Sequence, residues 1–377
     1  MLRHWPRLLF ASFLLCAAAE QAIAAGEAGG WETAAPEAVG LDAGKLSALA
    51  RDIGSGKFSN IHSLIVVRHG KLAFEQYFQG PDEHRGEAVG LMRFDKDTLH
   101  DMRSVTKSVT AILFGIALAG HAIKSADTPV LDYFPEYASL RTPQKAAIRL
   151  RDLLSMTSGL QWDEEKYPYS SPLNSEIAMD RAPDRYRYVL EQPVAAEPGT
   201  TFNYSGGDTA LLAAVIERAT KMRLDDYAEQ ALFRPLGITR YEWLKDATGT
   251  PIAASGLRLL PRDAAKLGLL YLQKGRWNGA QIVPESWVEA SLSPHANISP
   301  RPFGFQRYGY QWWLGTARVN DAAVPFAAAV GWGGQRILIV PSMDLVAVLT
   351  AGLYAERRQT DTTFAILLDG VLPAVKP

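Results

Sequence analysis

The chain has 377 residues, of which 47% are hydrophobic and 21% are charged, and its 39 basic and 40 acidic residues leave a formal charge of -1. This is the composition of a globular protein with enough apolar material for one large or two modest domains. The balanced charge, without a basic block, excludes a typical nucleic-acid-binding protein, and the single cysteine excludes an internal disulfide, a CxxC pair and a cysteine-rich zinc site.

The first 24 residues have the pattern of a secretory signal peptide. Two arginines precede an apolar run at residues 8–19, which is too short to span a bilayer as a helix, and residues 22–24 (AIA) supply the small side chains that a signal peptidase reads. An uncleaved N-terminal anchor is the alternative. We therefore expect a secreted or periplasmic protein that loses Cys16 with its leader and has no membrane span after cleavage.

The remaining elements are predicted in the order strands, helices, strands, helix. Residues 62–78 predict a hairpin with its turn at 68–71, and residues 104–121 predict a helix. A mostly helical stretch follows, then four strand-like runs (YGYQWWLG, VPFAAAVGW, RILIV and LVAVLTAG) and a final helix over residues 360–372. This order predicts an α/β sheet domain formed by residues 25–124 and 295–377, with a mostly helical domain, 125–294, inserted between them.

A Ser-x-x-Lys tetrad opens the helix predicted at residues 104–121. Ser104 and Lys107 are three residues apart, so that on a helix their side chains occupy neighbouring positions of one face. The helix N-terminus favours the alkoxide of a nucleophilic serine and the oxyanion formed on its attack. Lys107 can act as the base only if burial or a nearby cation lowers its pKa by several units from about 10.4. By itself the tetrad is a weak signal, and an exposed serine and lysine are the alternative.

Two later segments strengthen the interpretation of the tetrad as catalytic. Residues 197–205 (EPGTTFNYS) place Tyr204 shortly after a Pro-Gly turn, and residues 329–335 (AVGWGGQ) form a glycine-rich edge before the strand RILIV. Either segment can be ordinary structure, and Tyr204 can be a packed aromatic side chain. A nucleophile, an adjacent base and a third orienting group are nevertheless the set that nucleophilic catalysis requires.

With these motifs the chain resembles the serine β-lactamase and penicillin-binding-protein superfamily, on the class C side that includes DD-peptidases, esterases and 6-aminohexanoate-dimer hydrolases. Residues 153–160 (LLSMTSGL) resemble the L-L-x-x-T-S-G-L segment of this branch, and residues 198–205 resemble its P-G-x-x-F-x-Y-S segment. The resemblance implies a β-lactamase/transpeptidase-like α+β fold, in which an antiparallel sheet is flanked by helices and a mostly helical domain is inserted.

The resemblance also implies a role for each motif residue. Ser104 is the acylated nucleophile, Lys107 is its base, and Tyr204 passes a proton to the leaving group. The backbone N–H groups of Ser104 and of Gly334 or Gln335 form the oxyanion hole. The third motif, in which that hole lies, starts with Trp332 and Gly333.

Two departures from the family pattern bear on the substrate. Gly206 stands where the second motif has an asparagine that holds the substrate amide, and Asp208 is a candidate substitute. The third motif begins with Trp332 in place of the lysine that contacts a substrate carboxylate. Arg336 is a candidate replacement, with a solvent-facing position as its alternative. Both losses favour an esterase or amidase for smaller or uncharged acyl groups over a β-lactamase or DD-peptidase.

Other segments point less clearly to chemistry. The seven histidines form neither HxH nor HExxH, and residues 82–84 (DEH) are typical of a solvated loop, so we expect no metal site and no cofactor. The aromatic residues Tyr308, Tyr310, Trp312 and Trp313 alternate as a strand would. The polar loop around Trp162 and Tyr169 either covers the cleft or lies on the surface.

The sequence therefore predicts a secreted serine hydrolase that cleaves an ester or amide bond of a small molecule through an acyl-enzyme on Ser104. A catalytically weak protein that binds β-lactams or peptidoglycan as a sensor is the alternative on the same fold. A cell-wall scaffold without covalent chemistry is a third. No nucleic acid is expected as a partner.

Overall fold

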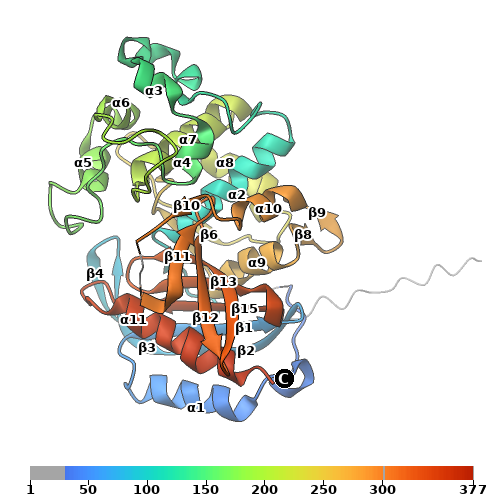
Figure 1. Cartoon of the computed structure of the whole chain (residues 1–377). Coiled ribbons are helices and arrows are strands. Elements are labelled where there is room, and N and C mark those ends of the chain that lie inside the picture. Colours follow the sequence, from blue (N-terminus) through green and yellow to red (C-terminus); the bar gives the residue numbers. More distant parts are fainter. Residues whose placement is uncertain (1–29, 300–301, 377) are drawn as a thin grey trace, which may run out of the picture.

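An antiparallel sheet of eight strands, drawn from both ends of the described chain, forms the base of the fold (Figure 1). The computed structural model describes residues 30–299 and 302–376, so the predicted leader at residues 1–24 lies outside it. The strands run in the order β10-β11-β12-β13-β14-β15-β1-β2. Their bounds are β1 (Ile61–Arg68), β2 (Lys71–Tyr77), β10 (Ala296–Asn297), β11 (Phe305–Tyr308), β12 (Trp313–Val319), β13 (Ala322–Gly331), β14 (Gln335–Val340) and β15 (Leu345–Ala351).

The central strands are buried on both faces because the sheet is covered on both sides. Every residue of β14 and β15 is buried, as is every residue of β1 except Arg68. β1 and β2 pair as the predicted hairpin, and both turn residues, His69 and Gly70, have positive φ angles of 51° and 74°. Such angles match the right-handed twist of a two-residue hairpin. The hairpin prediction and the last three predicted strands are confirmed.

The first of the four predicted C-terminal strands is wrong in part. Residues 309–312 form a turn between β11 and β12, so the aromatic residues around them do not alternate along one strand. Gln311 has a φ of 61°, and its buried amide donates to the carbonyl oxygens of Leu153 and Leu154 at 3.0 and 3.1 Å. These bonds fasten the turn to a helix far away in sequence. A positive φ at a buried glutamine is a tertiary effect that no alternation pattern reveals.

The two ends of the described chain supply the helices on one face of the sheet. α1 (Ala43–Gly54) packs there against the C-terminal helical segment, and a backbone bridge joins Leu41 to Val375 (Figure 1). That segment starts as α11 (Gln359–Phe364), widens into a π-helix at Ala365–Val371 and ends in a 3-10 turn. The helix predicted at residues 360–372 is therefore present, with a wider turn in its second half.

The opposite face carries the helix that contains the Ser-x-x-Lys tetrad. α9 (Pro261–Leu272) lies directly on β14, β15 and β1, while α2 (Val105–Ala119) packs along α7 (Gly206–Thr220) and reaches β13 and β14. The helical part lies beyond α2 and α9 on this side (Figure 1). Its other helices are α3 (Pro143–Ala147), α4 (Leu150–Leu154), α5 (Ser175–Arg181), α6 (Arg185–Glu191), α8 (Leu224–Ala228) and α10 (Glu285–Ser291). In the described ranges, no helix combines the length and apolarity that a membrane crossing requires.

Small sheets link the main sheet to the helical part. β3 (Gln79–His84) and β4 (Glu87–Arg93) form a hairpin that the sequence analysis did not predict, because its β4 side chains are mostly exposed. β5 (His100–Asp101) pairs with β7 (Leu257–Leu259), which pairs with β6 (Tyr241–Trp243). A further short pair is formed by β8 (Arg276–Trp277) and β9 (Ala280–Gln281). β5 runs directly into the tetrad and so sets its position.

Candidate active site

Ser104 is held at the N-terminus of α2 by a tight turn that follows β5. Arg103, the residue before it, has a φ of 48°, a left-handed conformation that is uncommon for a side chain of this size. Two contacts stabilise the turn: the N–H of Met102 donates to the carbonyl oxygen of Leu257 at 2.9 Å, and the Thr106 hydroxyl donates to that of Arg103 at 2.6 Å. Ser104 makes no cap hydrogen bond with its side chain, so its hydroxyl remains available for other partners.

Lys107 lies beneath Ser104 and is almost completely buried, with 1% of its surface exposed. Its Nζ donates to the Ser104 Oγ at 3.1 Å and to the carbonyl oxygen of Ala254 at 3.2 Å. The same nitrogen lies 4.9 Å from the centre of the Tyr204 ring. The structure thus brings together the three side chains that were predicted to form the catalytic set.

Two buried carboxylates, Glu164 and Glu176, complete the surroundings of Lys107. One oxygen of each lies 3.5 Å from its Nζ. Glu164 accepts hydrogen bonds from the Trp162 indole at 2.8 Å and from the N–H of Gly206 at 2.6 Å. The Tyr169 hydroxyl donates to its other oxygen at 3.0 Å. The loop that contains Trp162 and Tyr169 therefore folds into the site.

The sequence analysis missed both carboxylates. Glu164 lies in the run WDEEKYPY, where its charged neighbours Glu165 and Lys166 are exposed while Glu164 is buried. Glu176 lies in the first turn of α5, a position where a carboxylate also suits the helix dipole. The aromatic content of the loop was the one available signal that part of it packs inward.

The carboxylates determine the charge of Lys107. Burial by itself would lower its pKa, but Glu164 and Glu176 outweigh burial and raise that pKa above its ordinary value. The condition set above for a neutral lysine is therefore not met in the resting site. Burial and the neighbouring Glu176 raise the pKa of Glu164, whereas the Lys107 ammonium lowers the pKa of Glu176 despite its burial. These directions make Glu164 the weaker acid of a coupled pair.

Tyr204 approaches the same centre from the start of α7. Its hydroxyl is within hydrogen-bonding reach of Ser104 and Lys107. Burial raises its pKa to about 12, although the Lys107 ammonium acts in the opposite direction. Tyr204 is therefore a neutral phenol at rest and can give a proton to a leaving group. Its ring packs against Trp313, with centroids 5.5 Å apart.

A cavity of about 620 Å³ opens over Ser104 and has both polar and apolar walls. Tyr169 and Trp332 meet edge to face at its rim, with ring centroids 5.5 Å apart, and Trp332 is 42% exposed. Arg85 lines the wall from the β3–β4 turn, and Arg103 lines it beside Ser104. The Arg85 guanidinium pairs with Asp180 through Nη2 at 3.4 Å, and its Nη1 is buried without a hydrogen-bond partner among the described residues.

Of the third motif, only Trp332 lines this cavity. The N–H of Gly333 donates to the Gln359 side chain at 2.5 Å, and that of Gly334 donates to Gly331 within the turn at 3.3 Å. The Gln335 side chain exchanges hydrogen bonds with the backbone of β15. The oxyanion hole at Ser104 and Gly334 or Gln335 stays a prediction.

The two candidate substitutes for missing motif residues lie elsewhere. Asp208 is completely buried in the first turn of α7 and does not line the cavity. Arg336 is not on the solvent side: it is 1% exposed and donates to the carbonyl oxygens of Gly331 and Gln335 at 2.6 and 2.8 Å. Neither residue can contact a substrate in the cavity, and the positive groups there are arginines that the sequence analysis did not single out.

Comparisons with known proteins identify the family of the chain. The family model described as beta-lactamase matches residues 62–369. A 6-aminohexanoate-dimer hydrolase of Paenarthrobacter ureafaciens is 26% identical over 275 residues, which cover 68% of this chain and 66% of that relative. The chain thus spans just under two thirds of its length.

Solved structures share the fold. A penicillin-binding protein from Bacillus halodurans superposes with a TM-score of 0.64 at 18% identity, covering 85% of this chain and 99% of the other. A family VIII carboxylesterase superposes with a TM-score of 0.65 at 16% identity, covering 88% and 96%. The predicted β-lactamase/transpeptidase-like fold is confirmed.

Proposed function

The chain belongs to the beta-lactamase family, and from this premise we propose that it is a serine hydrolase that cleaves an ester or amide bond through an acyl-enzyme on Ser104. The observation that carries the proposal is the contact between the Lys107 Nζ and the Ser104 Oγ at the base of a cavity. A serine hydroxyl that contacts a buried amine beside a phenol has the partners that nucleophilic catalysis needs.

The charge of Lys107 determines how Ser104 loses its proton. Because Lys107 is an ammonium at rest, it takes the Ser104 proton only as it passes one of its own to the ionised Glu176, 3.5 Å away. The Ser104 oxygen then bonds to the substrate carbonyl carbon, and the tetrahedral intermediate collapses as Tyr204 protonates the leaving alcohol or amine. Tyr204 regains a proton from Lys107, which recovers one from Glu176. Water attacks the acyl-enzyme through the same relay in reverse and releases the acid.

Arg85 is the candidate group for binding a carboxylate on the substrate. The absence of the third-motif lysine predicts small or uncharged acyl groups instead. The Nη1 of Arg85 has no hydrogen-bond partner among the described residues and suits a carboxylate oxygen, although its Nη2 pairs with Asp180 at 3.4 Å and acidic side chains also line the cavity. The relative named for the 6-aminohexanoate dimer and the solved carboxylesterase support amides and esters as substrate classes.

The direct test compares the wild type with Ser104→Ala on p-nitrophenyl butyrate, the 6-aminohexanoate dimer and nitrocefin. We expect turnover of the ester or the amide by the wild type, and loss of at least about 1,000-fold in the variant. Nitrocefin separates a β-lactamase from an esterase or amidase. Equal rates in the two proteins would overturn the assignment of Ser104. A stable acyl adduct without turnover would favour the sensor alternative.

We also propose that the protein is secreted or periplasmic. The support is the charged start, apolar run and small residues within positions 1–24. N-terminal sequencing of the protein from a periplasmic or culture fraction should begin at Ala25. Recovery of an intact N-terminus from the cytoplasm would contradict this proposal.

A further inference from the structure

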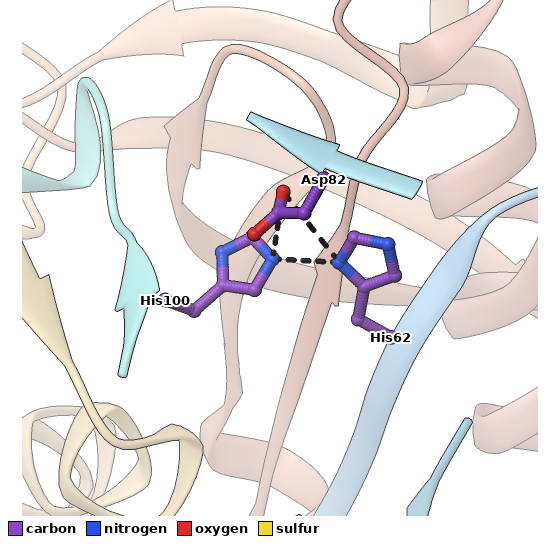
Figure 2. A group of neighbouring side chains, drawn as sticks. All are labelled: His62, Asp82 and His100. Carbon is purple, nitrogen blue, oxygen red and sulfur yellow. Dashed lines mark hydrogen bonds and ion pairs between the residues drawn. The ribbon is translucent and has the colours of Figure 1, made fainter. Parts of the chain in front are cut away.

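Three buried side chains from separate strands converge close to the turn that carries Arg85. His62 comes from β1, Asp82 from β3 and His100 from β5, and all three point toward one centre (Figure 2). The His62 Nδ1 lies 2.8 Å from the His100 Nε2. The Asp82 Oδ1 lies 3.9 Å from the former and 3.8 Å from the latter.

The hydrogen bonds of Asn60 fix the proton on His62. The Asn60 amide nitrogen donates to two carbonyl oxygens, those of Pro81 at 2.9 Å and Gly352 at 2.7 Å. Its Oδ1 must therefore be the atom that lies 2.9 Å from the His62 Nε2, and an amide oxygen only accepts. The Nε2 of His62 accordingly carries the proton, and in the neutral ring Nδ1 presents a lone pair to the centre.

His100 has the opposite tautomer for the same kind of reason. Its Nδ1 lies 3.1 Å from the carbonyl oxygen of Asp101, which can only accept, so Nδ1 carries the proton and Nε2 is bare. Two imidazole lone pairs thus face each other at 2.8 Å. Asp82 Oδ1 is buried and has no hydrogen-bond partner among the described residues. With the Asp82 carboxyl ionised, the three acceptors have no donor among them, and a cation between them would satisfy all three.

A proton is the poorer choice of cation. A buried imidazolium beside a carboxylate would form a direct hydrogen bond, but 3.8 and 3.9 Å are too long for one. A metal ion needs no N–H–N bond and can be reached by all three ligand atoms together.

We propose that His62, Asp82 and His100 bind one divalent transition-metal ion, with zinc as the best fit. Two imidazole nitrogens and one carboxylate oxygen are ligands that zinc prefers, with bonds of about 2.0–2.2 Å. Tetrahedral bonds of this length separate ligand atoms by about 3.4 Å, and the present spacings bracket that value. Asn60 and the Asp101 carbonyl act as the outer partners that orient metal-binding imidazoles.

The backbone at two glycines lies close to Asn60, the outer partner of His62. A Cβ on Gly80 would lie 2.1 Å from the Asn60 Oδ1, and one on Gly352 would lie 2.5 Å from its amide nitrogen. Phe94 stacks on the His62 ring with centroids 3.9 Å apart. The ion would join β1, β5 and the β3–β4 hairpin, which carries Arg85 into the cavity wall. Its role is therefore to hold this wall in place, outside the hydrolytic steps.

The test measures metal content and not hydrolysis. The full chain is stripped with a chelator, loaded with Zn²⁺, desalted and analysed for zinc. We expect about one zinc per chain in the wild type. The nearly isosteric Asp82→Asn should retain less than about a tenth of that amount. His69→Gln is the matched control, because His69 also pairs with an aspartate, Asp344 at 2.8 Å, but on the surface. It should bind as the wild type does.

A second measurement covers the case in which Asp82→Asn fails to fold. Co²⁺ added to the stripped wild type should show the intense visible bands of a four- or five-coordinate site, and one equivalent of Zn²⁺ should remove them. A stripped wild type that stays folded by circular dichroism but binds neither metal would overturn the proposal in favour of a bridging proton. Equal zinc in wild type and a folded Asp82→Asn would place the metal elsewhere and overturn it as well.

Discussion

At the scale of single residues, the charge on Lys107 is the feature with the widest consequences. The sequence places Ser104 and Lys107 on one helix face but does not show what surrounds them. The structure adds Glu164 and Glu176 at 3.5 Å, and with them the pKa of Lys107 is raised and not lowered. Catalysis then depends on a carboxylate that accepts a proton from the lysine.

This dependence makes the two carboxylates unequal. The pKa of Glu176 is lowered by the Lys107 ammonium and that of Glu164 is raised by burial and by Glu176, so Glu176 is the better acceptor for a proton from Lys107 once it is ionised. We expect Glu176→Gln to lower kcat by about 100-fold at neutral pH, because no acceptor for the Lys107 proton remains. Glu164→Gln resembles the protonated resting state and should cost less than about tenfold. Steady-state kinetics of the two matched variants check this, and equal losses would contradict the proposed relay.

Arg85 provides a prediction about substrate choice. Arg85 lines the cavity, and its Nη1 has no hydrogen-bond partner among the described residues. Arg85→Ala should raise KM by about tenfold for a p-nitrophenyl ester of glutarate, which carries a carboxylate, and should change KM for the butyrate ester little. Arg93→Ala, on the exposed strand β4 of the same hairpin, is the control. If Arg85→Ala affects both esters alike, Arg85 does not recognise the carboxylate.

Candidate site residues could be predicted from the sequence where they belong to a recognisable motif. Ser104 and Lys107 follow from a short spacing, Tyr204 follows from the resemblance of its segment to a family motif, and the structure brings the three side chains together. Glu164 and Glu176 are distant in sequence from the tetrad and have no motif, and Asp208 and Arg336 are near the motif residues only along the chain. The histidines of the proposed metal centre lie on separate strands, so they form no local pattern such as HxH or HExxH.

At the scale of elements, α2 shows how close packing places the nucleophile. A Cβ on Gly115 would lie 2.1 Å from the Trp287 ring, whose indole donates to the Ala111 carbonyl at 3.1 Å. A glycine is therefore required where α10 crosses α2. Local propensity would favour alanine at this helix position, so the requirement is set by packing.

Gly115→Ala consequently tests packing against propensity. Propensity alone predicts a gain of about 1 kcal/mol, whereas the clash with Trp287 predicts a net loss of about 1–3 kcal/mol in the free energy of unfolding. Urea denaturation measures the sign. In the double variant with Trp287→Leu, the loss should be smaller than the sum of the two single losses. A stabilised Gly115→Ala would show that the two helices are less closely packed.

Elements with strong local patterns were predicted well. The β1–β2 hairpin, α2 and strands β13 to β15 have apolar runs with clear turn residues between them. The β3–β4 hairpin was not predicted because β4 is exposed and its sequence lacks the alternation of apolar and polar residues. Residues 308–315 were wrongly predicted as one strand, because the turn at Gln311 is held by hydrogen bonds to a helix that is distant in sequence. Both failures come from tertiary contacts that are absent from a local window.

At the scale of the whole molecule, buried acids make stability depend on pH. Asp208 is completely buried, and burial raises its pKa well above the ordinary value. The folded state then keeps a proton that the unfolded state releases, so stability decreases as pH rises through the interval between the two pKa values. The loss is at most about 1.4 kcal/mol per pH unit for this group.

Asp208→Asn should remove this part of the pH dependence. Between about pH 5 and pH 8, its free energy of unfolding relative to the wild type should increase with pH, because the amide has no proton to lose. Asp369→Asn, at an exposed position, is the control and should follow the wild type. Urea denaturation at several pH values measures the difference. Parallel curves for wild type and Asp208→Asn would contradict a protonated Asp208 in the folded protein.

The measurement that tests the account most directly is the mass of the protein during turnover. The wild type is mixed with p-nitrophenyl butyrate, quenched in acid and digested, and the acylated peptide is mapped. We predict one butyryl group on Ser104 and none in Ser104→Ala. A butyryl group on another residue, or turnover without any adduct after rapid quenching, would contradict the acyl-enzyme on Ser104.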